Sequence, residues 1–258
     1  MPKIELKFSH LILMFLCFSG CAHLSSPKEA IELKIKGKKG DIEISLISLS
    51  RETQYYEKGE LSQRSIRNLT LKIKSEIDFI EGENFWIHNT TVEKKGNEAL
   101  HGFGFPELRE TIKLKLNPKG RVLEVEGYPK DSAFYLPPVM LPLTNVRMGE
   151  MWEETFHWNG EGQPVFLKTT IQCTLDSVQE WEKKKVYKIT MKAISLLEEE
   201  DRDNPDFTFK SSSEGYFLWD NEKGSVVYAQ STGRDEVRSL KDKNLSVTIT
   251  QFTSKTIP

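Results

Sequence analysis

A stretch of strict alternation between apolar and polar side chains constrains the fold of this chain more than any other feature. Over residues 69–79 every odd position except Ser75 is apolar, and every even position is polar. Successive side chains of a strand point to opposite faces, whereas a helix would mix the two kinds of side chain on every face. The segment is therefore predicted to be a strand of an antiparallel sheet that is dry on one face and solvated on the other.

Shorter alternations of the same kind recur along the chain. They lie at 31–35, 42–46, 112–116, 187–193 and 245–249. Runs with turn-forming residues separate them, at 37–40, 81–84, 117–120 and 220–224. Many strands divided by such turns are typical of all-β proteins. We predict an all-β fold, either a curved antiparallel sheet resembling half of a barrel or a sandwich.

Two stretches of the chain look alike. Residues 112–127 and 215–233 each contain a strand, a Lys-Gly turn, a second strand and a glycine, and the two Lys-Gly pairs stand 104 positions apart. Such internal repetition predicts two similar β halves. We place these halves at 29–128 and 147–258, with a connector at 129–146.

The connector is rich in proline and yet apolar, which allows two interpretations. Proline cannot donate a ladder hydrogen bond, so the segment is not a central strand. It is either a crossover packed against the sheet or a lip over an apolar groove that binds a ligand. On the second interpretation, the candidate ligand-binding residues are Phe134, Tyr135, Leu136, Met140, Leu141 and Trp152.

The start of the chain has the three parts of a secretion signal. Lys3 and Lys7 precede an apolar run at 11–18, and Ser19-Gly20 stands directly before Cys21. The apolar run is too short to span a bilayer, which needs about 20 residues. The pattern resembles a bacterial lipoprotein signal, with Phe18 where leucine is usual.

This resemblance implies a cellular location and a membrane anchor. Residues 1–20 would be the signal peptide, Cys21 would carry acyl chains such as palmitate, and residues 21–28 would form a short tether. The resemblance also implies that Ala22, which stands where aspartate retains lipoproteins at the inner membrane, directs the protein to the outer membrane. The anchored protein is then expected on the periplasmic side of the outer membrane.

The segment Val146-Arg-Met-Gly-Glu-Met-Trp152 has a second recognisable pattern. Proline followed by Val-x-x-Gly-x-x-Trp resembles a group of uncharacterised β-rich bacterial secreted proteins and lipoproteins, in which such a segment precedes a second β half. The resemblance covers about half of the chain after the signal and implies architecture alone.

Residues with reactive or metal-binding side chains are scattered. Cys173 alternates with apolar neighbours and is expected to be a small buried side chain. Glu153 and His157 would share one face of a strand, yet no further His or Cys has ligand spacing. The chain also lacks the motifs of serine hydrolases and zinc proteases. We expect no enzyme activity and no cofactor.

The overall charge narrows the choice of partners. The formal net charge is −2, and basic residues form no strong patch along the sequence, so nucleic acid is not an expected partner. We expect a membrane-tethered binding module for a lipid or another apolar ligand of the cell envelope. The alternative is a scaffold that recruits an envelope protein through a sheet edge. A hydrolase ranks last.

Overall fold

The computed structural model describes residues 29–96, 100, 105–126, 140–159, 166–198 and 207–257. The expected signal peptide, Cys21 and its tether lie outside the described residues, as do Phe134, Tyr135 and Leu136. Within the described ranges, all regular structure is β-strand, which confirms the all-β prediction. No helix in these ranges is long and apolar enough to cross a membrane.

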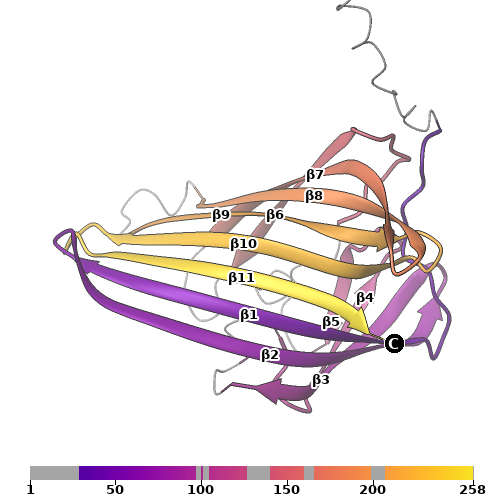
Figure 1. Ribbon diagram of the computed structural model, residues 1–258, viewed down its shortest axis with the longest axis horizontal. Helices are drawn as coiled ribbons and strands as arrows, with labels where there is room; N and C mark the ends of the chain where they lie inside the picture. The colour runs from indigo at the N-terminus through magenta and orange to yellow at the C-terminus, as the bar shows by residue number, and fades with distance from the viewer. Residues whose placement is uncertain are drawn as a thin grey trace, which may run out of the picture.

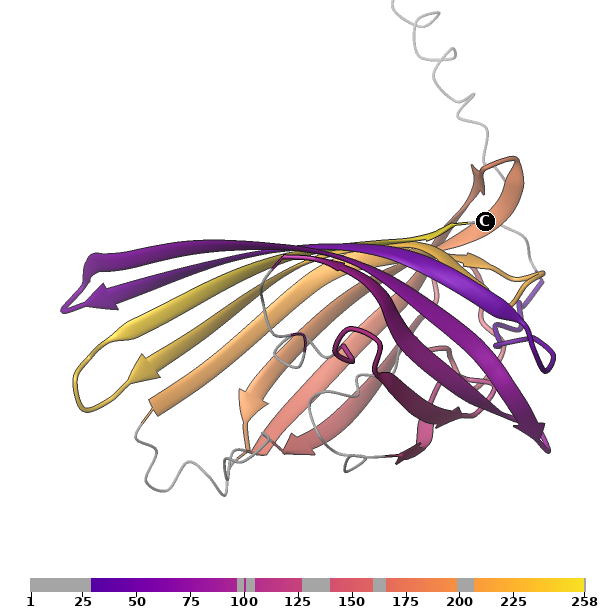
Figure 2. The same ribbon diagram turned by 90° about the horizontal axis from the view of Figure 1, so that it is seen from below.

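Eleven strands form one antiparallel sheet, so the curved-sheet prediction is confirmed, and the described part of the chain contains no second sheet packed on it as in a sandwich. The strands are β1 (Ile42–Glu57), β2 (Glu60–Glu81), β3 (Asn84–Lys95), β4 (Thr111–Leu116), β5 (Val122–Glu126), β6 (Met151–Asn159), β7 (Phe166–Trp181), β8 (Lys184–Leu197), β9 (Phe207–Asp220), β10 (Ser225–Ser239) and β11 (Leu245–Ile257). Figures 1 and 2 show the strands wrapping into a deep curve.

The sheet is an up-and-down meander whose chain starts in the middle. Its order is β5-β4-β3-β2-β1-β11-β10-β9-β8-β7-β6. Strands β1 and β11 therefore pair at the centre, with Ile44 opposite Ile257. The outermost strands are β5 and β6, and the described residues form no ladder between them, so the curve stays open.

The alternation of the sequence explains which face of the sheet is buried. In β2, Leu69, Leu71 and Ile73 are almost fully buried, while Thr70 and Lys72 between them point away from the core. The apolar set faces the concave side, where the neighbouring strands add their own apolar residues. The long alternating strand predicted at 69–79 is confirmed as the second part of β2.

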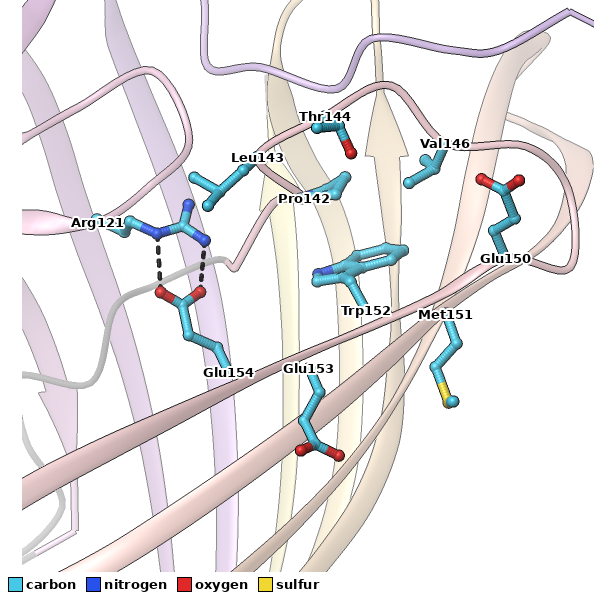
Figure 3. Close-up of a pocket in the computed structure, with 10 residues that line it drawn as sticks. All are labelled: Arg121, Pro142, Leu143, Thr144, Val146, Glu150, Met151, Trp152, Glu153 and Glu154. Carbon is cyan, nitrogen blue, oxygen red and sulfur yellow. Dashed lines mark hydrogen bonds and ion pairs between the residues drawn. The ribbon is translucent and has the colours of Figure 1, made fainter.

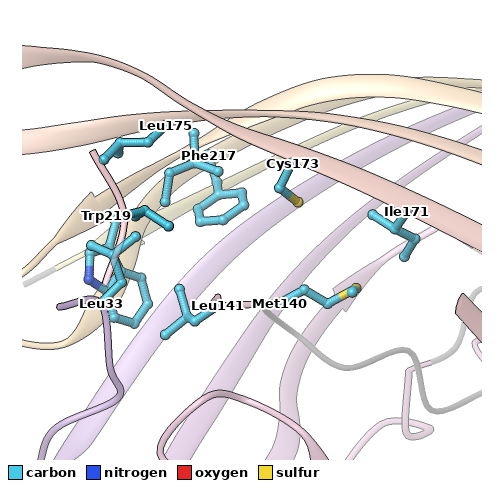
Figure 4. Close-up of a cluster of buried hydrophobic side chains, with 10 residues drawn as sticks. Leu33, Met140, Leu141, Ile171, Cys173, Leu175, Phe217 and Trp219 are labelled. Carbon is cyan, nitrogen blue, oxygen red and sulfur yellow. The ribbon is translucent and has the colours of Figure 1, made fainter. Parts of the chain in front are cut away.

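Two crossing segments fill the concave side at one end of the molecule (Figure 4). One contains Leu33 and the other Met140 and Leu141, and both pack against Cys173 and Trp219 of the sheet. The segments also pair with each other, because the N–H groups of Ile31 and Val146 each donate to the other's carbonyl at 2.7 and 3.0 Å. The main core therefore lies between the concave face of the sheet and these two segments, which connect strands and cross that face.

Further along the same face the side chains become small and polar. The residues that share the face of Phe217 include Ser211 and Ser213 of the same strand, Ser195 of β8 and Thr169 of β7. The hydroxyls of Thr169 and Ser195 are 2.6 Å apart and hydrogen-bonded. This region of the concave face is therefore hydrophilic and does not continue the apolar core.

Matching irregularities occur in the two halves of the sheet. Gly120 and Gly224 both adopt left-handed φ values, of 83° and 72°. Each is followed three residues later by an extra bulged residue, Leu123 in β5 and Val227 in β10. These features fit the predicted duplication into strands β1–β5 and β6–β11, which stays a prediction.

Candidate functional site: a pocket at the edge of the sheet

A pocket of about 390 Å³ lies where the end of the connector passes edge strand β6 (Figure 3). Residues from the connector, from the start of β6 and from the turn before β5 line it. They are Arg121, Pro142, Leu143, Thr144, Val146, Glu150, Met151, Trp152, Glu153 and Glu154. Segments that are distant in the sequence thus meet at this site.

Strand β6 presents its side chains to two sides of the pocket. Trp152 pairs with Cys173 of β7 and points toward the core, whereas the neighbouring Met151 and Glu153 point to the opposite face. The strand begins after Gly149, whose φ of 83° favours glycine and whose N–H donates to the Leu175 carbonyl at 2.7 Å. This turn therefore fixes where β6 begins along β7, and with it the position at which Trp152 points into the pocket.

The indole ring of Trp152 forms the apolar floor. Its Nε1–H donates to the backbone carbonyl of Met140 at 3.1 Å, so the polar atom of the ring is satisfied. In Figure 3 the ring lies below Pro142 and beside Val146. The hydrogen bond holds the ring in one orientation and leaves its apolar surface toward the pocket.

An ion pair between Arg121 and Glu154 closes one end of the pocket. The guanidinium donates to both carboxylate oxygens, at 2.8 Å from Nε and 2.5 Å from Nη2. Its Nη1 donates to the Leu141 carbonyl at 3.1 Å. Because Arg121 directly precedes β5 and Glu154 belongs to β6, this pair connects the two open edges of the sheet.

The mouth of the pocket is apolar at its rim and acidic around it. Leu143 is 69% exposed and Met151 is 58% exposed, which is unusual for large apolar side chains. Glu150 accepts a hydrogen bond from the Arg147 N–H at 2.8 Å. The lining holds one arginine and three glutamates, Glu150, Glu153 and Glu154, so it carries a formal excess of negative charge.

The structure divides the predicted ligand-binding residues into two groups. Met140 and Leu141 are 5% and 0% exposed and belong to the core, as the crossover interpretation of the connector expects. Trp152 lines the pocket. A ligand-binding role for Phe134, Tyr135 and Leu136, outside the described residues, stays a prediction.

Sequence reasoning missed most of the pocket. Arg121 and Glu154 are 33 positions apart, and no local pattern links them. Their meeting depends on the order of strands in the sheet, which puts β5 and β6 at opposite edges of the same curve. Leu143 belongs to the apolar connector predicted at 129–146, but only the structure shows that its side chain is exposed whereas that of Leu141 is buried.

Cys173 and His157, which carry reactive or metal-binding side chains, have structural roles. Cys173 is 1% exposed, and burial, helped by the negative charge of Glu154, raises the pKa of its thiol to about 12. The expectation of a small buried side chain is confirmed. His157 pairs with Glu198 at the end of β8 and not with Glu153. Within the described part of the chain, no three His, Cys, Asp or Glu side chains gather as a metal site would require.

Comparison with known proteins adds little to this geometry. No protein family and no curated protein matches the chain. Among solved structures, the chain is similar to the crystal structure of an outer membrane channel from Pseudomonas putida F1, over 86% of this chain and 97% of that one. The TM-score is 0.21 and the sequence identity 5%, so this similarity carries no functional argument.

Proposed function

We propose that this protein is a non-catalytic binding module, tethered through Cys21 to the periplasmic side of the outer membrane, that holds an apolar or amphipathic ligand in the Trp152 pocket. The pocket itself is the observation that carries the proposal. Its volume of about 390 Å³ falls within the usual range for small-molecule sites. Its floor and rim are apolar, while its ends are charged, which suits a ligand with an apolar body and a polar end.

The concave face supports the same choice of site. Its apolar end is filled by Leu33, Met140 and Leu141, its second apolar cluster on β1 and β2 is packed against Leu100 and Phe105, and the region across β7 to β9 is lined by serine and threonine side chains. An apolar ligand therefore has its best described surface at the edge pocket.

A fluorescent fatty-acid probe tests the proposal. The protein is extracted with organic solvent and titrated with the probe, and then the variants Leu143→Asp and Met151→Asp are titrated in the same way. A charge on the apolar rim should weaken probe binding at least about tenfold, since burying it costs more than 1.4 kcal/mol. Leu240→Asp is the control, because Leu240 is 49% exposed at the distant β10–β11 turn. Equal binding by all four proteins would contradict the pocket assignment.

The proposed anchor has a separate test. Cells that express the chain are labelled with an alkyne analogue of palmitate, and the protein is purified from the membrane fraction. Incorporation of the label should be lost in Cys21→Ser, while Cys173→Ser, which changes the buried thiol, should keep it. Label on the Cys21→Ser variant would place acylation elsewhere or end the lipoprotein assignment.

A second function is favoured by the open sheet edges. The described residues place no strand beside the outer edge of β6, and an extended segment of a partner protein could add there as a further strand. A photo-crosslinking amino acid at Thr155 should then capture a protein in cells. Adducts with lipid alone would contradict this function and favour the binding of an apolar ligand.

A further inference from the structure

We propose that one end of the molecule is a contact surface for an anionic lipid bilayer. This surface, called here the lysine-rich end, consists of residues 36–41, 181–185 and 220–224. The inference rests on the proposed membrane tether, but not on the ligand pocket. The three segments are distant in the sequence and are joined by direct contacts.

The contacts show that the three segments form one continuous surface. The backbone N–H of Lys36 donates to the Gly224 carbonyl at 3.4 Å, and its Nζ donates to the Asn221 carbonyl at 2.6 Å. Lys184 Nζ lies 3.8 Å from the carboxylate of Asp220. The turn between β9 and β10 therefore lies between the other two segments.

The surface is strongly enriched in exposed lysine. Its lysines are Lys36, Lys38, Lys39, Lys183, Lys184, Lys185 and Lys223, and all seven are exposed. The same segments hold four acidic residues, of which Asp220 is buried. Seven lysines against four carboxylates leave an excess of three positive charges, although the whole chain carries −2.

The opposite end of the molecule gives a direct contrast. There the turns at 57–60 and 239–244 connect β1 with β2 and β10 with β11. They hold three lysines and three acidic residues, so their charges balance. The positive excess is thus a property of these three segments, not of the turns in general: the β2–β3 turn at 81–84, at the same end as residues 36–41, carries Glu81 and Glu83.

Aromatic side chains accompany the lysines. Trp181 lies against Tyr228 with ring centroids 5.1 Å apart and ring planes tilted by 36°, and Lys255 Nζ lies 5.7 Å from the Trp181 ring and 2.9 Å from Glu182. Tryptophan and tyrosine beside lysine are typical of the membrane–water interface, where the rings sit at the level of the headgroups.

The backbone of the hairpin tip is also unusual. Glu182 and Lys183 both adopt left-handed φ values, of 48° and 66°, in a two-residue turn where asparagine and glycine are normally found. Strained backbone of this kind is common at functional positions. Here it places three consecutive lysines at the outermost point of the β7–β8 hairpin.

The proposed tether directs this end toward the membrane. Figure 1 shows that the described chain begins at the same end as the β7–β8 hairpin. Seven residues separate Cys21 from Glu29, so the eight Cα-to-Cα steps between them span at most roughly 28 Å. An acyl chain on Cys21 would thus hold the lysine-rich end close to the bilayer, where each lysine adds to the attraction for anionic headgroups.

Sedimentation with lipid vesicles tests this inference. All proteins carry Cys21→Ser, so none is acylated, and all share residues 1–28, whose contribution cancels between variants. The vesicles contain phosphatidylcholine with or without phosphatidylglycerol. We expect phosphatidylglycerol to strengthen binding, and added salt to reverse the gain.

Charge reversal then locates the surface. Lys38→Glu with Lys183→Glu should weaken binding to phosphatidylglycerol vesicles by about thirtyfold or more, given about a fivefold loss for each lysine removed. The control pair, Lys58→Glu with Lys243→Glu, makes the same change of charge at the opposite end and should leave binding within about twofold. Circular dichroism checks that both pairs are folded.

The remaining outcomes have clear meanings. Equal losses in the two pairs, or equal binding to both kinds of vesicle, would overturn the inference. The fatty-acid titration separates it from the pocket: Leu143→Asp should keep vesicle binding, and the lysine variants should keep probe binding. Failure of the probe to bind would therefore count against the pocket alone.

Discussion

Leu141 and Leu143 stand two residues apart in the connector but have opposite surroundings. Leu141 is 0% exposed against the core, while Leu143 is 69% exposed at the pocket rim. Leu141→Ala should lower the free energy of unfolding by about 3 kcal/mol, because it removes buried methyl groups and leaves a cavity. Leu143→Ala should change it by less than about 0.5 kcal/mol. Urea unfolding of both variants checks this, and similar losses would mean that both leucines are packed.

Cys173 should make stability depend on pH in the alkaline range. Its thiol ionises near 9.0 when unfolded, whereas burial raises the folded pKa to about 12. Between these values the unfolded state binds fewer protons, so the free energy of unfolding falls as pH rises, by up to about 1.4 kcal/mol per pH unit. Below pH 9 the contribution is constant.

Comparison with Cys173→Ala isolates this effect from the titration of lysines and tyrosines. The difference in the free energy of unfolding between the two proteins should shrink steadily above pH 9. A difference that stays constant through the alkaline range would show that the thiol ionises equally well in the folded protein.

At the scale of single elements, the turn of the β7–β8 hairpin has a strained backbone conformation that one substitution can relieve. Lys183 has a φ of 66°, which glycine adopts without the steric cost of a Cβ atom. Lys183→Gly should raise the free energy of unfolding by about 1 kcal/mol. Lys192→Gly in the regular part of the same strand, β8, should lower it by about 1 kcal/mol. Thermal unfolding of the two variants provides the measurement, and a loss in both would show that the turn is not strained.

Strands were the elements most predictable from sequence, since alternation is a local property. The segment 69–79 and the Lys-Gly turns at 119–120 and 223–224 are found as predicted. The choice between a curved sheet and a sandwich needed the pairing of β1 with β11, which no local pattern specifies. The Arg121–Glu154 ion pair was hidden for the same reason, because it joins the two edges of a sheet whose order was unknown.

At the scale of the whole molecule, stability should be distributed unevenly along the longest strand. Residues 60–67 of β2 have no buried side chain and pair only with β1, whereas residues 69–77 contain the buried core positions and pair with β1 and β3. Backbone amides at 60–67 should therefore exchange hydrogen at least about tenfold faster than those at 69–77. Hydrogen-exchange mass spectrometry checks this, and uniform protection would show that the sheet opens as one unit.

The central pairing of β1 with β11 has a consequence for how the protein is made. Ile44 is among the first strand residues to leave the ribosome, yet its partner Ile257 follows more than two hundred positions later. Until then β1 has an unpaired edge in the middle of the future sheet, and such edges recruit other chains. The edge of β1 that β11 will occupy therefore stays open during synthesis until residues 245–257 arrive, and over this interval β1 is most exposed to pairing with other chains.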